Sequence, residues 1–226
     1  MKNLIYVFTG TGNSLVAAKK IAETLGDAEI RLIRNLPKPV DGKYERIGFV
    51  FPCYAAGAPA FVIDYIRNMN ISKQSADYFF AVVTAGDKGA NSISMISKEL
   101  QRKGIELDFG TDLKTVGNYI ALYAMNPSPE QKLKSADEQA EKIAQQILKK
   151  TRLDRNDSAF HANPFVTLYY NFAQLVFAAK GRKMHAEPSC TGCGLCVKLC
   201  PSGNIRMAGG VPEFGRECTQ CMACVQ

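Results

Sequence analysis

The feature that most constrains this chain is a cluster of cysteines near the end of the sequence. Seven of its eight cysteines fall within the last 37 residues. Disulfides usually spread along a small secreted chain, whereas closely spaced cysteines in an intracellular protein more often hold a metal. The first nine residues lack the long apolar segment and the cleavage site of a secretory signal. We therefore expect a cytoplasmic protein whose cysteines are reduced and bind metal.

The spacing of these cysteines is typical of iron-sulfur ligands. The first four and the proline after them spell C-x2-C-x2-C-x3-C-P, the run of bacterial two-cluster ferredoxins, in which the fourth cysteine binds the other cluster. Thiolates suit iron-sulfide clusters because both are soft. Three further cysteines repeat the first three positions of the run. The predicted metal ligands are Cys190, Cys193, Cys196, Cys200, Cys218, Cys221 and Cys224.

The second motif has no fourth cysteine in the sequence given. By the exchange of fourth ligands, one cluster takes Cys200 with the three cysteines of the second motif, and the other has only Cys190, Cys193 and Cys196. Two explanations remain open. Either the chain continues past Gln226 to another x-Cys-Pro, or this cluster has an open iron site or loses an iron. Zinc is the alternative for all seven cysteines, although zinc ribbons separate two CxxC pairs by a longer stretch.

The first 150 residues alternate short apolar runs with helical patterns, which is typical of a parallel sheet with crossover helices. We expect strands at residues 3–9, 28–34, 46–51, 78–84 and, interrupted, 106–116. We expect helices at residues 13–25, 59–68, 91–103 and 129–150. The last of these opens with Ser128 as the cap and Pro129 at the first helical position.

A polar, charged segment at residues 151–158 is expected to be a linker. Beyond it, an apolar run with aromatics at residues 165–179 is expected to be a helix. A membrane span needs about 20 apolar residues, and this run is shorter and includes Asn171 and Gln174. We expect a helix packed between two domains, with an interfacial membrane helix as the alternative. Its predicted apolar face consists of Phe165, Leu168, Tyr169, Phe172, Leu175, Val176 and Ala179.

A glycine-rich loop follows the first predicted strand and opens the first predicted helix. Backbone N–H groups and hydroxyls of such a loop bind phosphate at the positive end of the helix dipole. The loop is not a Walker A motif, because no Gly-Lys-Ser/Thr follows, and it lacks the third glycine of the dinucleotide pattern. A turn without a ligand remains the alternative. The predicted phosphate contacts are Thr9, Gly10, Thr11, Gly12, Asn13 and Ser14.

The order of strands and motifs resembles the flavodoxin-ferredoxin fusion family. Residues 1–150 are similar to a flavodoxin and residues 185–226 to a two-cluster ferredoxin, with residues 151–184 as the expected linker and interdomain helix. The resemblance implies an α/β fold, a doubly wound five-stranded parallel sheet of order 2-1-3-4-5, followed by a small α+β iron-sulfur domain. It also implies FMN and two 4Fe-4S clusters as cofactors. The loops after the third and fourth strands would hold the flavin, in agreement with the rule that ligands bind beyond the carboxyl ends of strands at the switch point.

One departure from ordinary flavodoxins concerns the aromatic residue that stacks on the flavin. The loop at residues 84–89 has none, so Tyr54 and Tyr119 are the candidates, with surface packing as the alternative for each. Cys53 lies in the same region and is expected to pack as a small hydrophobe, and Asp87 either binds the flavin or caps its loop. The implied flavin contacts are Pro52, Tyr54, Ala55, Ala56, Gly57, Thr84, Ala85, Gly86, Asp87, Gly89, Asn118 and Tyr119.

The two cofactor sets indicate an electron-transfer protein. A flavin takes electrons in ones or twos and each cluster passes one at a time, so a chain with both acts as a relay. The expected partner is another redox protein, a ferredoxin or a reductase. The alternative is an enzyme that reduces a small acceptor, such as a quinone, at the flavin. The net charge of +7 is spread over many residues without a nucleic-acid-binding motif, so we expect neither nucleic acid nor membrane as a partner.

Overall fold

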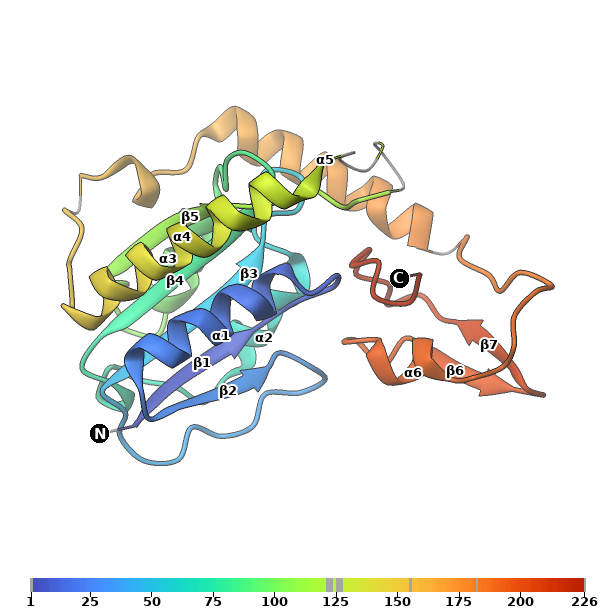
Figure 1. Cartoon of the computed structure of the whole chain (residues 1–226), viewed down its shortest axis with the longest axis horizontal. Helices are drawn as coiled ribbons and strands as arrows, with labels where there is room; N and C mark the ends of the chain where they lie inside the picture. The colour runs from blue at the N-terminus through green and yellow to red at the C-terminus, as the bar shows by residue number, and fades with distance from the viewer. Residues whose placement is uncertain (1, 121–123, 125–127, 155, 182, 226) are drawn as a thin grey trace.

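The computed structural model describes residues 2–120, 124, 128–154, 156–181 and 183–225, apart from the side chains of residues 178–180. Its largest element is a five-stranded parallel sheet of order β2-β1-β3-β4-β5 (Figure 1). This order confirms the predicted doubly wound α/β fold. The strands are β1 (Asn3–Val7), β2 (Ala28–Leu32), β3 (Arg46–Pro52), β4 (Phe79–Ala85) and β5 (Phe109–Lys114).

Helices cover both faces of this sheet. Side chains of α1 and α4 pack with one face, and side chains of α2 and α3 pack with the other. Burial on both faces explains why β1, β3 and β4 read as nearly continuous apolar runs instead of alternating patterns. The helices are α1 (Asn13–Leu25), α2 (Ala60–Asn68), α3 (Ser92–Gln101) and α4 (Pro129–Leu148), with short 3-10 turns η1 (Lys73–Ser75) and η2 (Ser158–Phe160).

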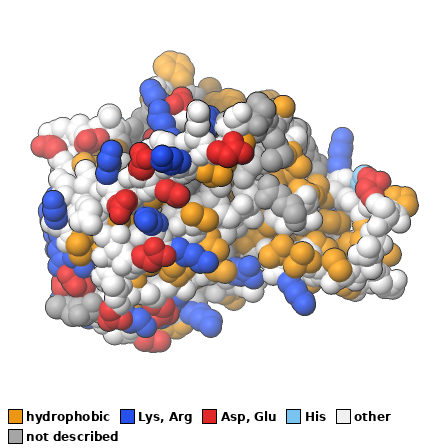
Figure 2. All heavy atoms as spheres, viewed as in Figure 1, with side chains coloured by type: hydrophobic (Ala, Val, Ile, Leu, Met, Phe, Trp, Pro, Cys, Tyr) orange, Lys and Arg blue, Asp and Glu red, His pale blue; other side chains and the backbone are white. Residues whose placement is uncertain are grey.

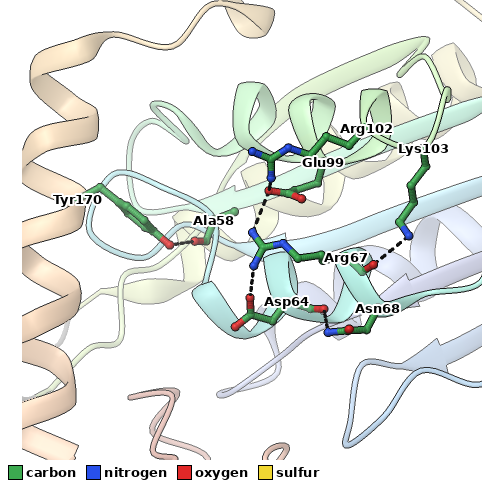
Figure 3. Close-up of polar contacts among 8 residues, drawn as sticks. All are labelled: Ala58, Asp64, Arg67, Asn68, Glu99, Arg102, Lys103 and Tyr170. Atoms are coloured by element: carbon green, nitrogen blue, oxygen red, sulfur yellow. Dashed lines mark hydrogen bonds and ion pairs between the residues drawn. The ribbon is translucent and has the colours of Figure 1, made fainter.

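Helix α5 (Pro164–Gly181) lies along the sheet domain and reaches toward the C-terminal end of the chain (Figure 1). Its Tyr170 points from the helix toward the loop after β3 (Figure 3), where the hydroxyl donates to the Ala58 carbonyl at 2.8 Å. Gly57 makes room for this ring, since a Cβ at Gly57 would lie 2.4 Å from Tyr170 Cδ2. The buried residues of the helix thus include Tyr170 and Ala173.

The packing face of α5 differs from the predicted apolar stripe. Phe165 is 81% exposed and Leu175 is 71% exposed, and the side chain of Ala179 lies outside the described residues. The physical reason is that α5 is apolar on both sides, so apolar spacing does not distinguish the packing face from the exposed face. None of the described helices is long and apolar enough to cross a membrane. The exposed members of the stripe are Phe165, Leu168, Tyr169, Phe172, Leu175 and Val176.

The C-terminal unit, residues 183–225, contains the short helix α6 (Leu195–Leu199) and the antiparallel strands β6 (Ile205–Ala208) and β7 (Val211–Phe214). It lies beside one end of the sheet domain (Figure 1). Two hydrogen bonds join it to the segment after β2: Asn35 N donates to Pro201 O at 3.1 Å, and the Arg34 guanidinium donates to Lys198 O at 3.1 Å. Figure 2 shows both signs of charge interspersed over the sheet domain, while hydrophobic side chains gather toward the C-terminal unit.

Candidate functional site

A cleft with a cavity volume of about 170 Å³, open to solvent, lies at the carboxyl ends of the strands. This is where ligands bind in open α/β sheets. Loops after β1, β3, β4 and β5 all contribute to its wall. The residues proposed from the sequence that line it are Thr9, Gly10, Thr11, Asn13, Ser14, Pro52, Tyr54, Ala55, Thr84, Ala85, Gly86, Asn118 and Tyr119.

Other residues proposed from the sequence have structural roles beside the cleft. The Asp87 carboxylate is exposed and pairs with Lys114 at 3.2 Å. The Gly89 N–H donates to Asp112 Oδ2 at 2.7 Å. Gly57 lies under the Tyr170 ring, as described above. The residues of the sequence-based set that the structure does not place on the cleft lining are Gly12, Ala56, Gly57, Asp87 and Gly89.

The loop between β1 and α1 is held by hydrogen bonds from three directions. Within the loop, Gly12 N donates to Thr9 Oγ1 at 3.1 Å. The hydroxyls of Ser14 and Thr84 form a buried hydrogen bond of 2.7 Å. The Asn13 side chain donates to Val116 O at 3.0 Å.

The amide of Asn118 also donates to Thr11 Oγ1. These bonds fix the start of α1 at the cleft lining, where the unpaired N–H groups and the positive dipole end of a helix favour an anion. The residues therefore fit the phosphate of a nucleotide such as FMN.

One wall of the cleft is aromatic and was only partly predicted. The rings of Tyr119 and Phe177 lie 5.8 Å apart at an interplanar angle of 53°, and Tyr169 lines the cleft beside them. Tyr169 and Phe177 come from α5, for which periodicity predicted a helix but no binding role. The loop after β5 also contributes Thr115, Val116 and Gly117, which the rule for strand ends could have identified from the sequence.

Cys53 lies on the cleft lining as well. Burial raises the pKa of its thiol, and its Sγ lies 3.5 Å from the Gly89 carbonyl oxygen. A raised pKa keeps the thiol protonated at neutral pH, and the thiolate is the reactive form. The environment of Cys53 therefore fits the packing role expected from the sequence.

The second cysteine motif forms the remaining part of the cleft, and this was not predicted. Gln220, Cys221 and Met222 line it. A Cβ added at Gly10 would lie 1.8 Å from the Cys221 carbonyl oxygen, and one at Gly181 would lie 2.6 Å from Cys218 Cβ. The motif is thus packed between the β1–α1 loop and the end of α5. No spacing rule relates a cysteine motif to a distant glycine loop, so the sequence gives no signal for this contact.

Four thiols lie close enough to interact electrostatically. Burial raises the pKa of Cys224 to about 11, with further increases from Cys221, Cys218 and Cys200. Burial likewise raises the pKa of Cys221, and Cys200 and Cys218 add to the effect. This grouping joins the last cysteine of the first motif with the three cysteines of the second. It is the set expected from the exchange of fourth ligands.

The first three cysteines have a different environment. Cys190 and Cys193 are exposed, and hydrogen bonds from the Leu195 N–H and the Thr191 hydroxyl lower the pKa of Cys193. In the part of the chain that the structure describes, no group of three or more His, Cys, Asp or Glu side chains has the arrangement of a site for one metal ion. A 4Fe-4S cluster instead takes four thiolates, one at each iron.

Asn91 anchors the helix that supplies the aromatic wall. Its side chain donates to Asn163 O and to Thr167 Oγ1, each at 2.9 Å, and accepts from Asn163 N at 3.0 Å. Asn91→Ala removes all three bonds, so we expect the protein to lose about 2 kcal/mol of stability. This loss corresponds to a midpoint about 4–8 °C lower in thermal unfolding.

The matched control is Asn68→Ala, because Asn68 makes one exposed bond to Asp64 O on α2 (Figure 3). This change is expected to stay within about 0.5 kcal/mol of the unsubstituted chain. Hydrogen exchange should also quicken at the start of α5 in the Asn91 variant alone. Equal midpoints for the two variants would contradict the anchoring role of Asn91.

Comparison with known proteins identifies the C-terminal unit. Residues 183–226 match the family model of the 4Fe-4S dicluster domain. No curated protein sequence matches the chain significantly.

Similar solved structures over the sheet domain include a Streptococcus pneumoniae TIGR4 flavodoxin, 12% identical, covering 67% of this chain and 100% of its own, with a TM-score of 0.44. A Fusobacterium nucleatum flavodoxin bound to flavin mononucleotide is 12% identical, with coverages of 67% and 100% and a TM-score of 0.42. Rubredoxin oxygen:oxidoreductase from Desulfovibrio gigas is 14% identical, with coverages of 66% and 35% and a TM-score of 0.42. The fold assignment rests on the strand order and not on these distant matches.

Proposed function

We propose that this chain, which joins a flavodoxin-like sheet to a 4Fe-4S dicluster domain, relays electrons between two 4Fe-4S clusters and FMN and on to a partner redox protein. The observation that carries the proposal is that the second cysteine motif lines the same cleft as the β1–α1 loop. FMN, when bound, would exchange electrons in ones or twos with clusters that pass one at a time.

We divide the cysteines into a proximal set, of which Cys221 lines the cleft, and a distal set, of which no member lines it. The proximal set is Cys200, Cys218, Cys221 and Cys224, whose thiols interact with one another. The distal set is Cys190, Cys193 and Cys196, of which the first two are exposed. In the relay that we propose, the proximal set holds the cluster that faces the flavin. The exposure of Cys190 and Cys193 supports the distal set as the place where the partner protein docks.

The cleft residues support FMN as the group held there. The start of α1 provides N–H donors and a positive dipole end for a phosphate. The aromatic wall formed by Tyr119, Tyr169 and Phe177 provides apolar surface for a flat ring system. These side chains bind and orient the flavin, and the C-terminal unit closes one side of the cleft.

The openness of the cleft favours one alternative function. A cleft that stays open to solvent would admit a small acceptor such as a quinone, which the chain would then reduce without a protein partner. Steady-state turnover of a small quinone by the purified chain, without any partner protein, would support this reductase activity. Electron delivery to an added ferredoxin or reductase, with negligible quinone turnover, would support the relay.

The composition of the purified protein provides the first test of the proposal. We expect one FMN per chain and about eight irons per full-length chain, because two 4Fe-4S clusters hold four irons each. After anaerobic reduction of the clusters, flavin absorbance should bleach within the same chain. A protein that carries zinc and shows no flavin absorbance would contradict both the relay and the reductase.

A further inference from the structure

Gln220 connects the cleft lining to a proximal cysteine. Its Oε1 accepts from the Tyr119 hydroxyl at 2.9 Å, and its Nε2 donates to Cys218 Sγ at 3.5 Å. The residue is 4% exposed, so the protein and not bulk water supplies its hydrogen-bond partners. Its backbone has a left-handed φ of 55°, an uncommon conformation for glutamine, which is maintained by the packing around it.

The surroundings of Gln220 leave little freedom for its side chain. A Cβ at Gly181, the last residue of α5, would lie 3.4 Å from Gln220 Nε2 and 2.6 Å from Cys218 Cβ. Glycine at the end of α5 therefore lets the helix approach the cysteine motif and the amide closely. Gln220 lies in a space bounded by α5, the Tyr119 hydroxyl and Cys218.

The chemistry of a bound cluster determines which way the amide faces. A cysteine sulfur bound to iron carries no hydrogen and only accepts hydrogen bonds, so the NH2 group of Gln220 must face Cys218. The carbonyl oxygen then faces Tyr119, whose hydroxyl is a donor. Tyr119 thus stabilises the amide orientation in which the Gln220 NH2 group donates to the Cys218 sulfur.

We propose that Gln220 raises the reduction potential of the proximal cluster, with Tyr119 as the positioning residue that orients the Gln220 amide. This inference deepens the proposed function and rests on it. Reduction adds one electron to the cluster and leaves its thiolate ligands in place. A hydrogen bond donated to a ligand sulfur stabilises the more negative, reduced form, and such bonds are one of the ways in which proteins set cluster potentials.

The decisive variant is Gln220→Met, which keeps a similar side-chain length and removes both hydrogen bonds. At a fixed electrode potential near the midpoint, we expect the ratio of reduced to oxidised proximal cluster to fall about tenfold. This change equals about 59 mV for one electron. The measurement is a potentiometric titration followed by electron paramagnetic resonance. The proximal signal is identified as the one missing from a Cys200→Ser chain.

The distal cluster in the same molecule provides an internal control, because general damage to the C-terminal unit would move both potentials. Gln101→Met is the matched control on α3, where the Gln101 amide donates to Ser97 Oγ at 3.3 Å. This variant should leave both potentials unchanged. A Gln220→Met chain in which both clusters shift equally, or neither shifts, would overturn the inference and leave the proposed relay intact.

Tyr119→Phe gives a second and independent test, since it removes one oxygen atom and leaves every group at the cysteines in place. Its proximal potential should fall in the same direction but by less. The double variant should match Gln220→Met alone, because both changes affect the potential through the same hydrogen bond, from Gln220 Nε2 to Cys218 Sγ. Additive shifts would overturn the positioning role of Tyr119. An unsubstituted chain without iron or FMN would instead overturn the proposed function and this inference with it.

Discussion

A methyl group added at Gly10 is expected to separate the C-terminal unit from the cleft. The new Cβ would lie 1.8 Å from the Cys221 carbonyl oxygen and 2.8 Å from its carbonyl carbon. Both atoms belong to the backbone, so no flexible side chain can move aside. Gly10 is not among the positive-φ glycines, which means that alanine itself fits the local conformation. The effect of Gly10→Ala therefore comes from the contact between the two parts of the chain.

The size of the effect follows from the cost of overpacking, about 1–3 kcal/mol. The β1–α1 loop is tied to the sheet by the Ser14–Thr84 hydrogen bond, so the C-terminal unit is the part that moves. The population in which this unit contacts the cleft should then fall by about 5- to 150-fold. Electron transfer from the proximal cluster to the flavin should slow with it, because the cysteine motif leaves the cleft wall.

Stopped-flow reduction of the flavin by the clusters, under anaerobic conditions, measures this loss. Gly86→Ala is the matched control: Gly86 also lines the cleft, and its Cβ would lie 3.7 Å from Gly117, an ordinary contact. This variant should keep the small-angle scattering profile of the unsubstituted chain. Small-angle scattering should show expansion for Gly10→Ala alone. Unchanged scattering and an unchanged rate for Gly10→Ala would contradict the close approach of the two parts.

Local periodicity was sufficient to predict the sheet domain. β1, β3 and β4 are mainly apolar runs of five to seven residues. The helical patterns between them indicate a parallel sheet with crossover helices. α1 begins and ends at the predicted residues, 13 and 25. β1 ends at Val7, earlier than predicted, and Thr9 belongs to the loop, where its side chain accepts from Gly12 N.

Tertiary contacts were beyond the reach of the sequence patterns. The packing face of α5 depends on Gly57, whose missing side chain admits the Tyr170 ring, and no pattern within the helix records this. The same holds for the place of the second cysteine motif beside Gly10. The spacing leads us to expect which cysteines share a cluster, because ligand geometry is local. It does not indicate which part of the chain the second motif contacts. The parts of the cleft wall that come from α5 and from the second cysteine motif depend on such long-range contacts.

Replacement of Cys200 by serine is expected to remove the proximal cluster and to spare the distal one. Cys200 belongs to the first motif by sequence, yet it raises the pKa of Cys221 and of Cys224 in the second motif. We therefore expect iron to fall by about four atoms per chain, and the same loss for Cys218→Ser. Cys190→Ser should instead spare the proximal cluster. Cys53→Ser is the matched control, since Cys53 lies on the sheet domain and should leave the iron content unchanged.

The position of each cluster in the relay gives this prediction a second consequence. Loss of the proximal cluster should abolish reduction of the flavin by an electron donor that docks at the distal set, because none of the distal cysteines lines the cleft. Cys190→Ser should keep fast exchange between the proximal cluster and the flavin. If Cys200 instead completed the first motif, Cys200→Ser would behave like Cys190→Ser and flavin reduction would survive. The pairwise comparison of Cys200→Ser with Cys190→Ser and with Cys218→Ser therefore determines which cluster Cys200 binds and which cluster faces the flavin.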